Sequence, residues 1–362
     1  MVRYQSVTSP ARFRHSGDVQ PGTAQNEAAI AHRCGDYRSP DPGLLGLPAL
    51  ARSPMTPGYV ALREGAAVLD LSARGKIWAT GEDRARLLHA MTTNHIQQLK
   101  PGEGCYAFFL NAQGRILGDV NLLCFEDHFL LDTEPETHAK LFEHLDRYII
   151  ADDVTVEDRT DRMATMALEG PQAEQVLAKL DAPLPAPEYA SAKWGDRVIA
   201  RINSTGSNGY FIFTSADDKA ALIGELVAAG ATPATADDAR TVRLEHGRPR
   251  YGEEITERFL VQETGQMQAI HFSKGCYLGQ EIVERVRSRA QIHRVLRKLE
   301  IDTDQAPAAG TKLKVGEADA AEIAGAAFSP ALGKTVALAY VRTAHSEPGT
   351  ELTLGDAKAR VA

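Results

Sequence analysis

Three consecutive β-strands are predicted in residues 106–132, which read YAFFLNAQGRILGDVNLLCFEDHFLLD. The strands are Tyr106–Leu110, Ile116–Phe125 and His128–Asp132. The connection Asn111–Gly114 has the Asn and Gly residues of a hairpin turn. Strands that follow one another through such short turns pair in an antiparallel sheet.

Helical and strand patterns surround this stretch. The segment Glu134–Ile149 is predicted as a helix, because Leu141 and Leu145 fall on one face at helical spacing. Strands are predicted before and after it, at Lys76–Thr80 and Val154–Val156. This order indicates an α+β layer with helices on one face of an antiparallel sheet.

A similar order recurs further along the chain, which indicates two related α+β halves. After Gln291 the character changes, and short apolar runs alternate with Gly and Pro turns, as in a small antiparallel barrel or sandwich. The second half comprises a strand at Arg162–Leu168, a helix after Gly170, a loop at Pro187–Gly195, a hairpin formed by Arg197–Ile202 and Gly209–Phe213, and a helix at Ala216–Ala229.

Four segments are therefore expected. The predicted division is a poorly ordered arm at 1–55, a first α+β domain at 56–160, a second α+β domain at 161–290 and a barrel domain at 291–362. The arm is rich in Pro, Gly, Ser and charge and lacks the apolar region of a secretory signal.

Composition excludes several classes of protein. No apolar run approaches the roughly 20 residues of a membrane span, so no membrane partner is expected. The net charge of −8 opposes general coating of nucleic acid. The four cysteines, at 34, 105, 124 and 276, are far apart and share no C-x-x-C spacing. We therefore expect a cytoplasmic protein with reduced thiols and no metal site.

The most unusual segment is Lys274–Glu281, KGCYLGQE. Cys276 lies just ahead of a predicted helix at Glu281–Arg289, where backbone N–H groups favour an anion. A thiol there, beside Lys274, would have a lowered pKa. A reactive cysteine and a small residue in a tight Gly-flanked turn are equally consistent with this chemistry.

A basic cluster follows this segment. An arginine fork suits a carboxylate or a phosphate, so a polyglutamate tail or an RNA backbone would fit the cluster. The alternative is a solvated helix face whose partners are Glu281 and Glu284. The members are Arg285, Arg287, Arg289, His293, Arg294, Arg297 and Lys298.

Two other places carry candidate residues. Asp119 lies on a strand after a hairpin, where its carboxylate could contact a ligand nitrogen, although a lone Asp on a strand more often faces solvent. The segment Arg240–Gly252 alternates charged and apolar residues, which is also consistent with Arg–Glu pairs inside a core. Nucleophile-elbow, P-loop and H-E-x-x-H motifs are absent from the sequence.

Taken in order, these segments resemble the folate-binding family of the glycine-cleavage T-protein, an aminomethyltransferase. Residues that resemble its motifs are Asp70–Ser72, Thr80–Asp83, Met91–Asn94, Arg243–Gly247, Tyr251–Gly252, Ser329–Pro330 and Ala337–Val341. The resemblance implies a clover of two α+β, ferredoxin-like domains and a C-terminal β-barrel around a central tetrahydrofolate channel. Within the family, the segment Lys274–Glu281 is similar to the signature of the YgfZ type.

Two positions depart from the T-protein pattern. Its hairpin strand resembles N-x-x-G-G-x-x-D-D, and the acidic pair contacts folate, whereas here Gly118 precedes the single acid Asp119. It also has an acidic residue that holds the pterin where this chain has Phe211. A phenyl ring cannot supply the paired hydrogen bonds of a carboxylate.

The resemblance implies a tetrahydrofolate-binding accessory protein that supports iron–sulfur cluster assembly or repair and, indirectly, tRNA modification. Its partners would be iron–sulfur proteins or their assembly machinery. The alternatives are a tetrahydrofolate-dependent aminomethyltransferase and an RNA-binding adaptor that contacts tRNA through the basic cluster. The candidate residues are Cys276 and Lys274 for chemistry, and Asp119, Arg240, Glu245, Tyr251 and Arg285 for folate.

Overall fold

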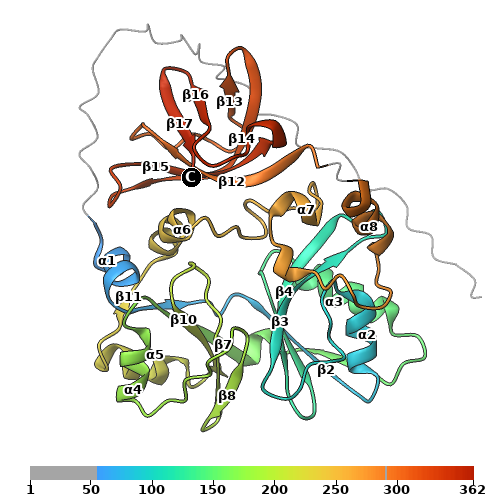
Figure 1. Ribbon diagram of the computed structural model, residues 1–362. Helices are drawn as coiled ribbons and strands as arrows, with labels where there is room; N and C mark the ends of the chain where they lie inside the picture. The colour runs from blue at the N-terminus through green and yellow to red at the C-terminus, as the bar shows by residue number, and fades with distance from the viewer. Residues whose placement is uncertain (1–54, 290–291) are drawn as a thin grey trace, which may run out of the picture. The chain divides into compact units, whose positions relative to one another are not determined.

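The computed structural model describes residues 55–289 and 292–362, and Figure 1 labels most of their helices and strands. Apart from Met55, the predicted arm lies outside the described residues. Two β-sheets and a closed β-barrel make up the described part, which confirms the predicted class of α+β layers with a small antiparallel barrel. No helix in these two ranges is long and apolar enough to cross a membrane.

The first sheet contains the strands of the opening stretch, in the order β3-β4-β5-β2-β6, and every pairing is antiparallel. Leu141 and Leu145 of α3 are buried in one apolar cluster with Val120 and Leu122 of β4, so α3 covers this sheet as predicted. Its elements are β2 Gly75–Thr80, α2 Arg84–Met91, β3 Gly104–Leu110, β4 Ile116–Cys124, β5 Phe129–Thr133, α3 His138–Tyr148 and β6 Thr155–Asp158.

The second sheet has the order β11-β1-β7-β10-β9-β8. Leu222 and Leu226 of α5 pack with Met166 and Ile212 from its central strands. The short strand β8 falls inside the predicted loop 187–195, which is therefore only partly a loop. Its elements are β1 Ala67–Asp70, β7 Met163–Glu169, α4 Ala173–Lys179, β8 Ser191–Trp194, β9 Arg197–Ala200, β10 Gly209–Ser215, α5 Lys219–Ala228 and β11 Thr232–Pro233.

The chain exchanges segments between the two sheets, so sheet membership does not follow the predicted boundary at residue 160. Strand β1 pairs with β7 and β11 of the second sheet although it precedes the whole first sheet. Conversely, Tyr251, Val261 and Val283 pack against Phe108 and Ile116 of the first sheet. Each sheet therefore contacts segments from the other half of the α+β region.

Two helices, α1 and α6, are tied together by their N-terminal caps. Thr235 and Asp238 form a capping box at the start of α6, and the Thr56 hydroxyl, which caps α1, also donates to Asp238. The remaining helical elements are α1 Pro57–Glu64, α6 Ala236–Glu245, α7 Val261–Thr264, α8 Gln280–Arg289 and the 3-10 turns η1 Thr160–Arg162, η2 Met267–Ala269 and η3 Thr343–His345.

The C-terminal residues close into a barrel of order β12-β15-β14-β13-β16-β17. The apolar runs at 295–301, 312–315, 336–341 and 351–354 predict β12, β13, β15 and β16, whereas β14 and β17 were not predicted. A bulge at Ile323–Gly325 interrupts β14, and Gly325 lies against Glu253 and Glu254, where a Cβ would have no room. The elements are β12 Arg294–Ile301, β13 Lys312–Val315, β14 Ala318–Ser329, β15 Lys334–Arg342, β16 Glu351–Leu354 and β17 Ala357–Val361.

Candidate functional site

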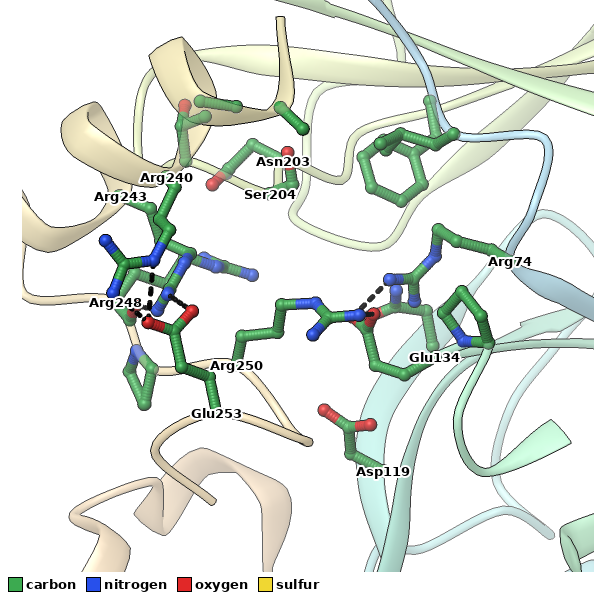
Figure 2. A pocket seen from close by; sticks show the side chains of 18 of the residues that line it. Arg74, Asp119, Glu134, Asn203, Ser204, Arg240, Arg243, Arg248, Arg250 and Glu253 are labelled. Atoms are coloured by element: carbon green, nitrogen blue, oxygen red, sulfur yellow. Dashed lines mark hydrogen bonds and ion pairs between the residues drawn. The ribbon is translucent and has the colours of Figure 1, made fainter. Parts of the chain in front are cut away.

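The candidate site is a cavity of about 360 Å³ lined by residues from both sheets and from α6 with the loop after it. This volume is in the range of ligand pockets, roughly 300–1,000 Å³. Figure 2 shows side chains that line it. Its polar and aromatic lining includes Arg74, Tyr106, Asp119, Asn121, Glu134, Tyr189, Phe211, Arg240, Arg243, Arg248, Arg250 and Glu253.

Asp119 has the least satisfied buried side chain of this lining. Residues alternate across β4, so Gly118 faces α3 and Asp119 faces the cavity. Oδ2 accepts a hydrogen bond of 2.8 Å from the Tyr106 hydroxyl. Oδ1 is buried and has no hydrogen-bond partner among the described residues. Burial, with the negative charge of Glu134, raises the pKa of Asp119 to about 7, and Arg74 opposes this rise.

A buried ion-pair network stands beside Asp119. Arg74 follows β1, and its guanidinium donates to Asp132 at 2.8–3.0 Å and also to Glu134. Its carbon Cζ lies 5.7 Å from the centre of the Phe211 ring. The prediction of a helix from Glu134 was wrong by four residues, because α3 starts at His138 and leaves Glu134 in the turn after β5, at the cavity.

The opposite wall carries Arg240 on α6. Its guanidinium donates to Glu253 and, at 2.9 Å, to the carbonyl oxygen of Ala326 in the barrel. Arg243 pairs with Glu253 at 2.6 Å and Glu254 at 2.7 Å. Both interpretations of the segment Arg240–Gly252 therefore hold: it forms Arg–Glu pairs, and it also lines the cavity.

Two models of one protein family match most of the sequence. Residues 36–274 match the GCVT N-terminal domain, and residues 294–362 match the glycine cleavage T-protein C-terminal barrel domain. The chain belongs to the glycine cleavage T-protein family.

Several relatives in this family are named aminomethyltransferase. That of Streptomyces coelicolor is 31% identical over 309 residues, covering 81% of this chain and 82% of the relative. That of Rubrobacter xylanophilus is 29% identical over 294 residues, or 78% of each chain. The glycine cleavage system aminomethyltransferase T of Bartonella henselae has the same fold, with a TM-score of 0.77 at 23% identity over 84% of this chain and 87% of that chain.

The two departures from the T-protein pattern lie at the first sheet and at the cavity wall. A Cβ at Gly118 would lie 2.9 Å from Leu141 and 3.1 Å from Thr137, so α3 leaves no room for a carboxylate there. Phe211 is 1% exposed and lines the cavity beneath Arg74. The cavity nevertheless has a second carboxylate next to Asp119, because Glu134 lines it as well.

Lys274 and Cys276 do not line this cavity. The Lys274 amine is buried and donates to three backbone carbonyl oxygens, those of His89, Thr92 and Asn94, at 2.5–2.7 Å. Burial lowers the pKa of Lys274 to about 7, whereas three acceptors around one nitrogen favour the protonated amine. The Lys274 amine is therefore held by backbone oxygens, and activation of Cys276 by Lys274 stays a prediction. Cys276 is exposed, ahead of α8.

Three further residues that were predicted to bind folate do not line the cavity and contact other parts of the protein. Glu245 accepts hydrogen bonds from Tyr59, Arg63 and Ser329, which link α1, α6 and the barrel. The Tyr251 hydroxyl donates to the carbonyl oxygen of Ile116 at 3.1 Å. Arg285 is half exposed and pairs with Glu281 on its own helix, as the alternative of a solvated helix face requires. Of the folate candidates, the cavity thus brings together Asp119 and Arg240.

Arg74 and Glu134 line the cavity although they were not named as site candidates, and so do Arg248 and Arg250, which were not singled out within the segment Arg240–Gly252. Arg74 and Glu134 each come shortly after a strand, at Asp70 and Thr133. Charged residues directly after apolar strands are a signal that could have identified both. Among the described residues, no group of three or more His, Cys, Asp or Glu side chains could hold a metal ion.

Proposed function

We propose that this chain binds tetrahydrofolate in the cavity beside Asp119 and acts there as a folate-dependent one-carbon transferase of the aminomethyltransferase type. One observation carries the proposal: Oδ1 of Asp119 is buried, lacks a partner among the described residues and belongs to a side chain that lines the cavity. The relatives named aminomethyltransferase support the same reading.

The lining of the cavity fits a reduced folate. Asp119 and Glu134 offer carboxylates to the N–H groups of a pterin, and Tyr106, Tyr189 and Phe211 offer aromatic surface. Arginines on the opposite wall suit the carboxylates of the glutamyl tail. The ligand therefore has a partner for its polar head, its ring and its charged tail.

Tetrahydrofolate would supply the nitrogen that accepts the one-carbon unit. Asp119 is the residue placed to hold or release a proton, at Oδ1. A carboxyl group with a pKa near 7 exchanges protons efficiently at neutral pH. Tyr106 fixes the carboxyl orientation through Oδ2, so Oδ1 remains directed to the ligand.

The test is transfer of the aminomethyl group from its lipoyl carrier protein to tetrahydrofolate. We expect turnover by the wild type, a loss of about 100-fold or more in Asp119→Asn, as for removal of a general acid–base group, and full activity in Cys276→Ser. Binding of tetrahydrofolate without turnover would restrict the function to folate binding. Turnover unaffected by Asp119→Asn would refute the role given to Asp119.

A second function, in support of iron–sulfur cluster assembly or repair in the cytoplasm, rests on Cys276. Its thiol is exposed and outside the cavity, and the YgfZ-type resemblance of Lys274–Glu281 concerns the same residues. Iron–sulfur proteins or their assembly machinery would be its partners, and tRNA modification would depend on it indirectly. In cells lacking the protein, the activity of an iron–sulfur enzyme should be restored by the wild type and not by Cys276→Ser. Equal restoration by both would eliminate this function.

A further inference from the structure

Five arginines line the cavity, and four of them have carboxylate partners. Figure 2 shows Arg248 with Arg240 and Arg243 on one side of the cavity, and Arg74 with Glu134 on the other. The pairs are Arg74 with Asp132 and Glu134, Arg240 with Glu253, Arg243 with Glu253 and Glu254, and Arg250 with Glu134 and Glu136.

Arg248 differs from the other four. Within residues 55–289 and 292–362, no carboxylate lies within ion-pair distance of its guanidinium. Its backbone is nonetheless fixed, because its N–H donates to the carbonyl oxygen of Arg243 at 3.0 Å and its own carbonyl oxygen accepts from the Arg243 guanidinium at 2.7 Å. The position of Arg248 is thus set by the fold while its charge is not neutralised.

The neighbour of this guanidinium is Tyr189. Burial raises the pKa of Tyr189 to about 12, and the Arg248 guanidinium beside its hydroxyl opposes that rise. Tyr189 has a φ of +63°, in the left-handed region that costs a non-glycine residue about 1–2 kcal/mol. Such a conformation persists only where the surroundings impose it. Here the Tyr189 N–H donates to the carbonyl oxygen of Arg201 at 2.9 Å, and the ring is buried.

The charges of the cavity give a ligand one orientation. Asp119, which has no ion-pair partner among the described residues, repels an anion and attracts N–H groups, whereas Arg248 attracts an anion. A guanidinium with free N–H groups beside an aromatic wall suits a carboxylate, which it can bind through two parallel hydrogen bonds. A ligand with an amine-rich head and a carboxylate tail would therefore place its tail at Arg248.

We propose that Arg248 anchors a glutamyl carboxylate of the folate bound in this cavity. The inference rests on the proposed function, which it deepens by assigning the tail of the ligand to one residue. The anchor determines specificity between folates and pterins without a tail, and it takes no part in proton transfer.

Calorimetric titration with two ligands tests this anchor. The ligands are tetrahydrofolate and a tetrahydropterin that lacks the aminobenzoyl-glutamate tail. Arg248→Met should weaken the binding of tetrahydrofolate about tenfold or more, because one charge-assisted pair is lost. The affinity for the pterin should not change. Arg248→Lys should recover part of the loss, because it restores the charge without the fork. The matched control Arg162→Met, an exposed arginine outside the cavity, should change neither ligand.

The outcomes separate this inference from the proposed function. If Arg248→Met, with wild-type circular dichroism, weakened the binding of both ligands equally, the anchoring role of Arg248 would be wrong. The proposal that the cavity binds folate would remain. Unchanged affinity for both ligands would also overturn it. Failure of the wild type to bind either ligand would overturn the proposed function and the anchor together.

Discussion

The Tyr106 hydroxyl donates a 2.8 Å hydrogen bond to Oδ2 of Asp119. Tyr106 and Asp119 lie on the neighbouring strands β3 and β4, so the sheet itself fixes the orientation of this carboxyl. The other oxygen, Oδ1, is buried without a partner in the described part of the chain. Leaving a buried acceptor unsatisfied costs about 1–3 kcal/mol. A group of this kind beside a cavity indicates a ligand contact.

The Asp119→Asn variant should be more stable than the wild type at alkaline pH. Burial raises the pKa of Asp119 from the reference value of 3.8 to about 7. Between these values the folded state binds a proton that the unfolded chain has lost, so stability falls as pH rises from 4 to 7. The loss is complete above pH 7 and amounts to roughly 2–4 kcal/mol at about 1.4 kcal/mol per pKa unit.

Thermal unfolding at pH 5 and pH 8 measures this difference. The gain in Tm for Asp119→Asn should be large at pH 8 and small at pH 5, where the wild-type carboxyl is already protonated in the folded state. If the wild type were more stable than Asp119→Asn at pH 8, ionisation of Asp119 would not lower the free energy of unfolding, and the prediction would be wrong.

Arg74→Met should destabilise the protein and raise the pKa of Asp119 further. Removal of the guanidinium leaves the buried Asp132 without its ion-pair partner, whereas Glu134 keeps Arg250, and breaking a buried pair costs roughly 3–5 kcal/mol. It also removes the positive charge that opposes protonation of Asp119. Urea unfolding measures the first effect, and carboxyl titration by NMR the second. An unchanged Asp119 titration in the variant would show that Arg74 does not act on Asp119.

Lys274→Met should lower stability by about 2–3 kcal/mol, because three buried carbonyl oxygens lose a charged donor. Its affinity for tetrahydrofolate should stay at the wild-type value, since Lys274 does not line the cavity. Cys276→Ser, at an exposed position, should alter neither quantity. Loss of folate affinity in a folded Lys274→Met protein would contradict this separation of Lys274 from the cavity.

Glu245→Gln should weaken the attachment of the barrel by roughly 1–3 kcal/mol. Its carboxylate accepts from Tyr59 at 2.5 Å and Ser329 at 2.6 Å and pairs with Arg63, and an amide cannot replace all three contacts. Urea unfolding provides the measurement, with Glu300→Gln on a partly exposed pair as the control. Equal stabilities of the two variants would mean that the Glu245 contacts contribute little.

The sequence predicted the fold well where apolar periodicity is strong. Leu141 and Leu145 identified α3, and the strands around Asn111–Gly114 were found with small errors in their ends. The pairing of β1 with β7 was not predictable, because a four-residue strand carries no information about its partner. Strand β14 was missed since it is rich in alanine, which has a low preference for strands.

The site was less predictable than the fold. Asp119 and Arg240 were identified through the resemblance and do line the cavity. Lys274 was predicted to activate Cys276 because the two are only two residues apart in sequence, yet the side chain of Lys274 donates to the carbonyl oxygens at the end of α2. Contacts between distant segments, such as those of Glu245 with Tyr59 and Ser329, leave no local pattern to recognise.

The most direct test of the account is calorimetric titration of tetrahydrofolate into the wild-type protein and into Asp119→Asn. The account predicts saturable binding to the wild type, weakened about tenfold or more in the variant by loss of a charged hydrogen-bond acceptor. Absence of saturable binding to the wild type, or equal binding by both proteins, would contradict the claim that this cavity holds folate at Asp119.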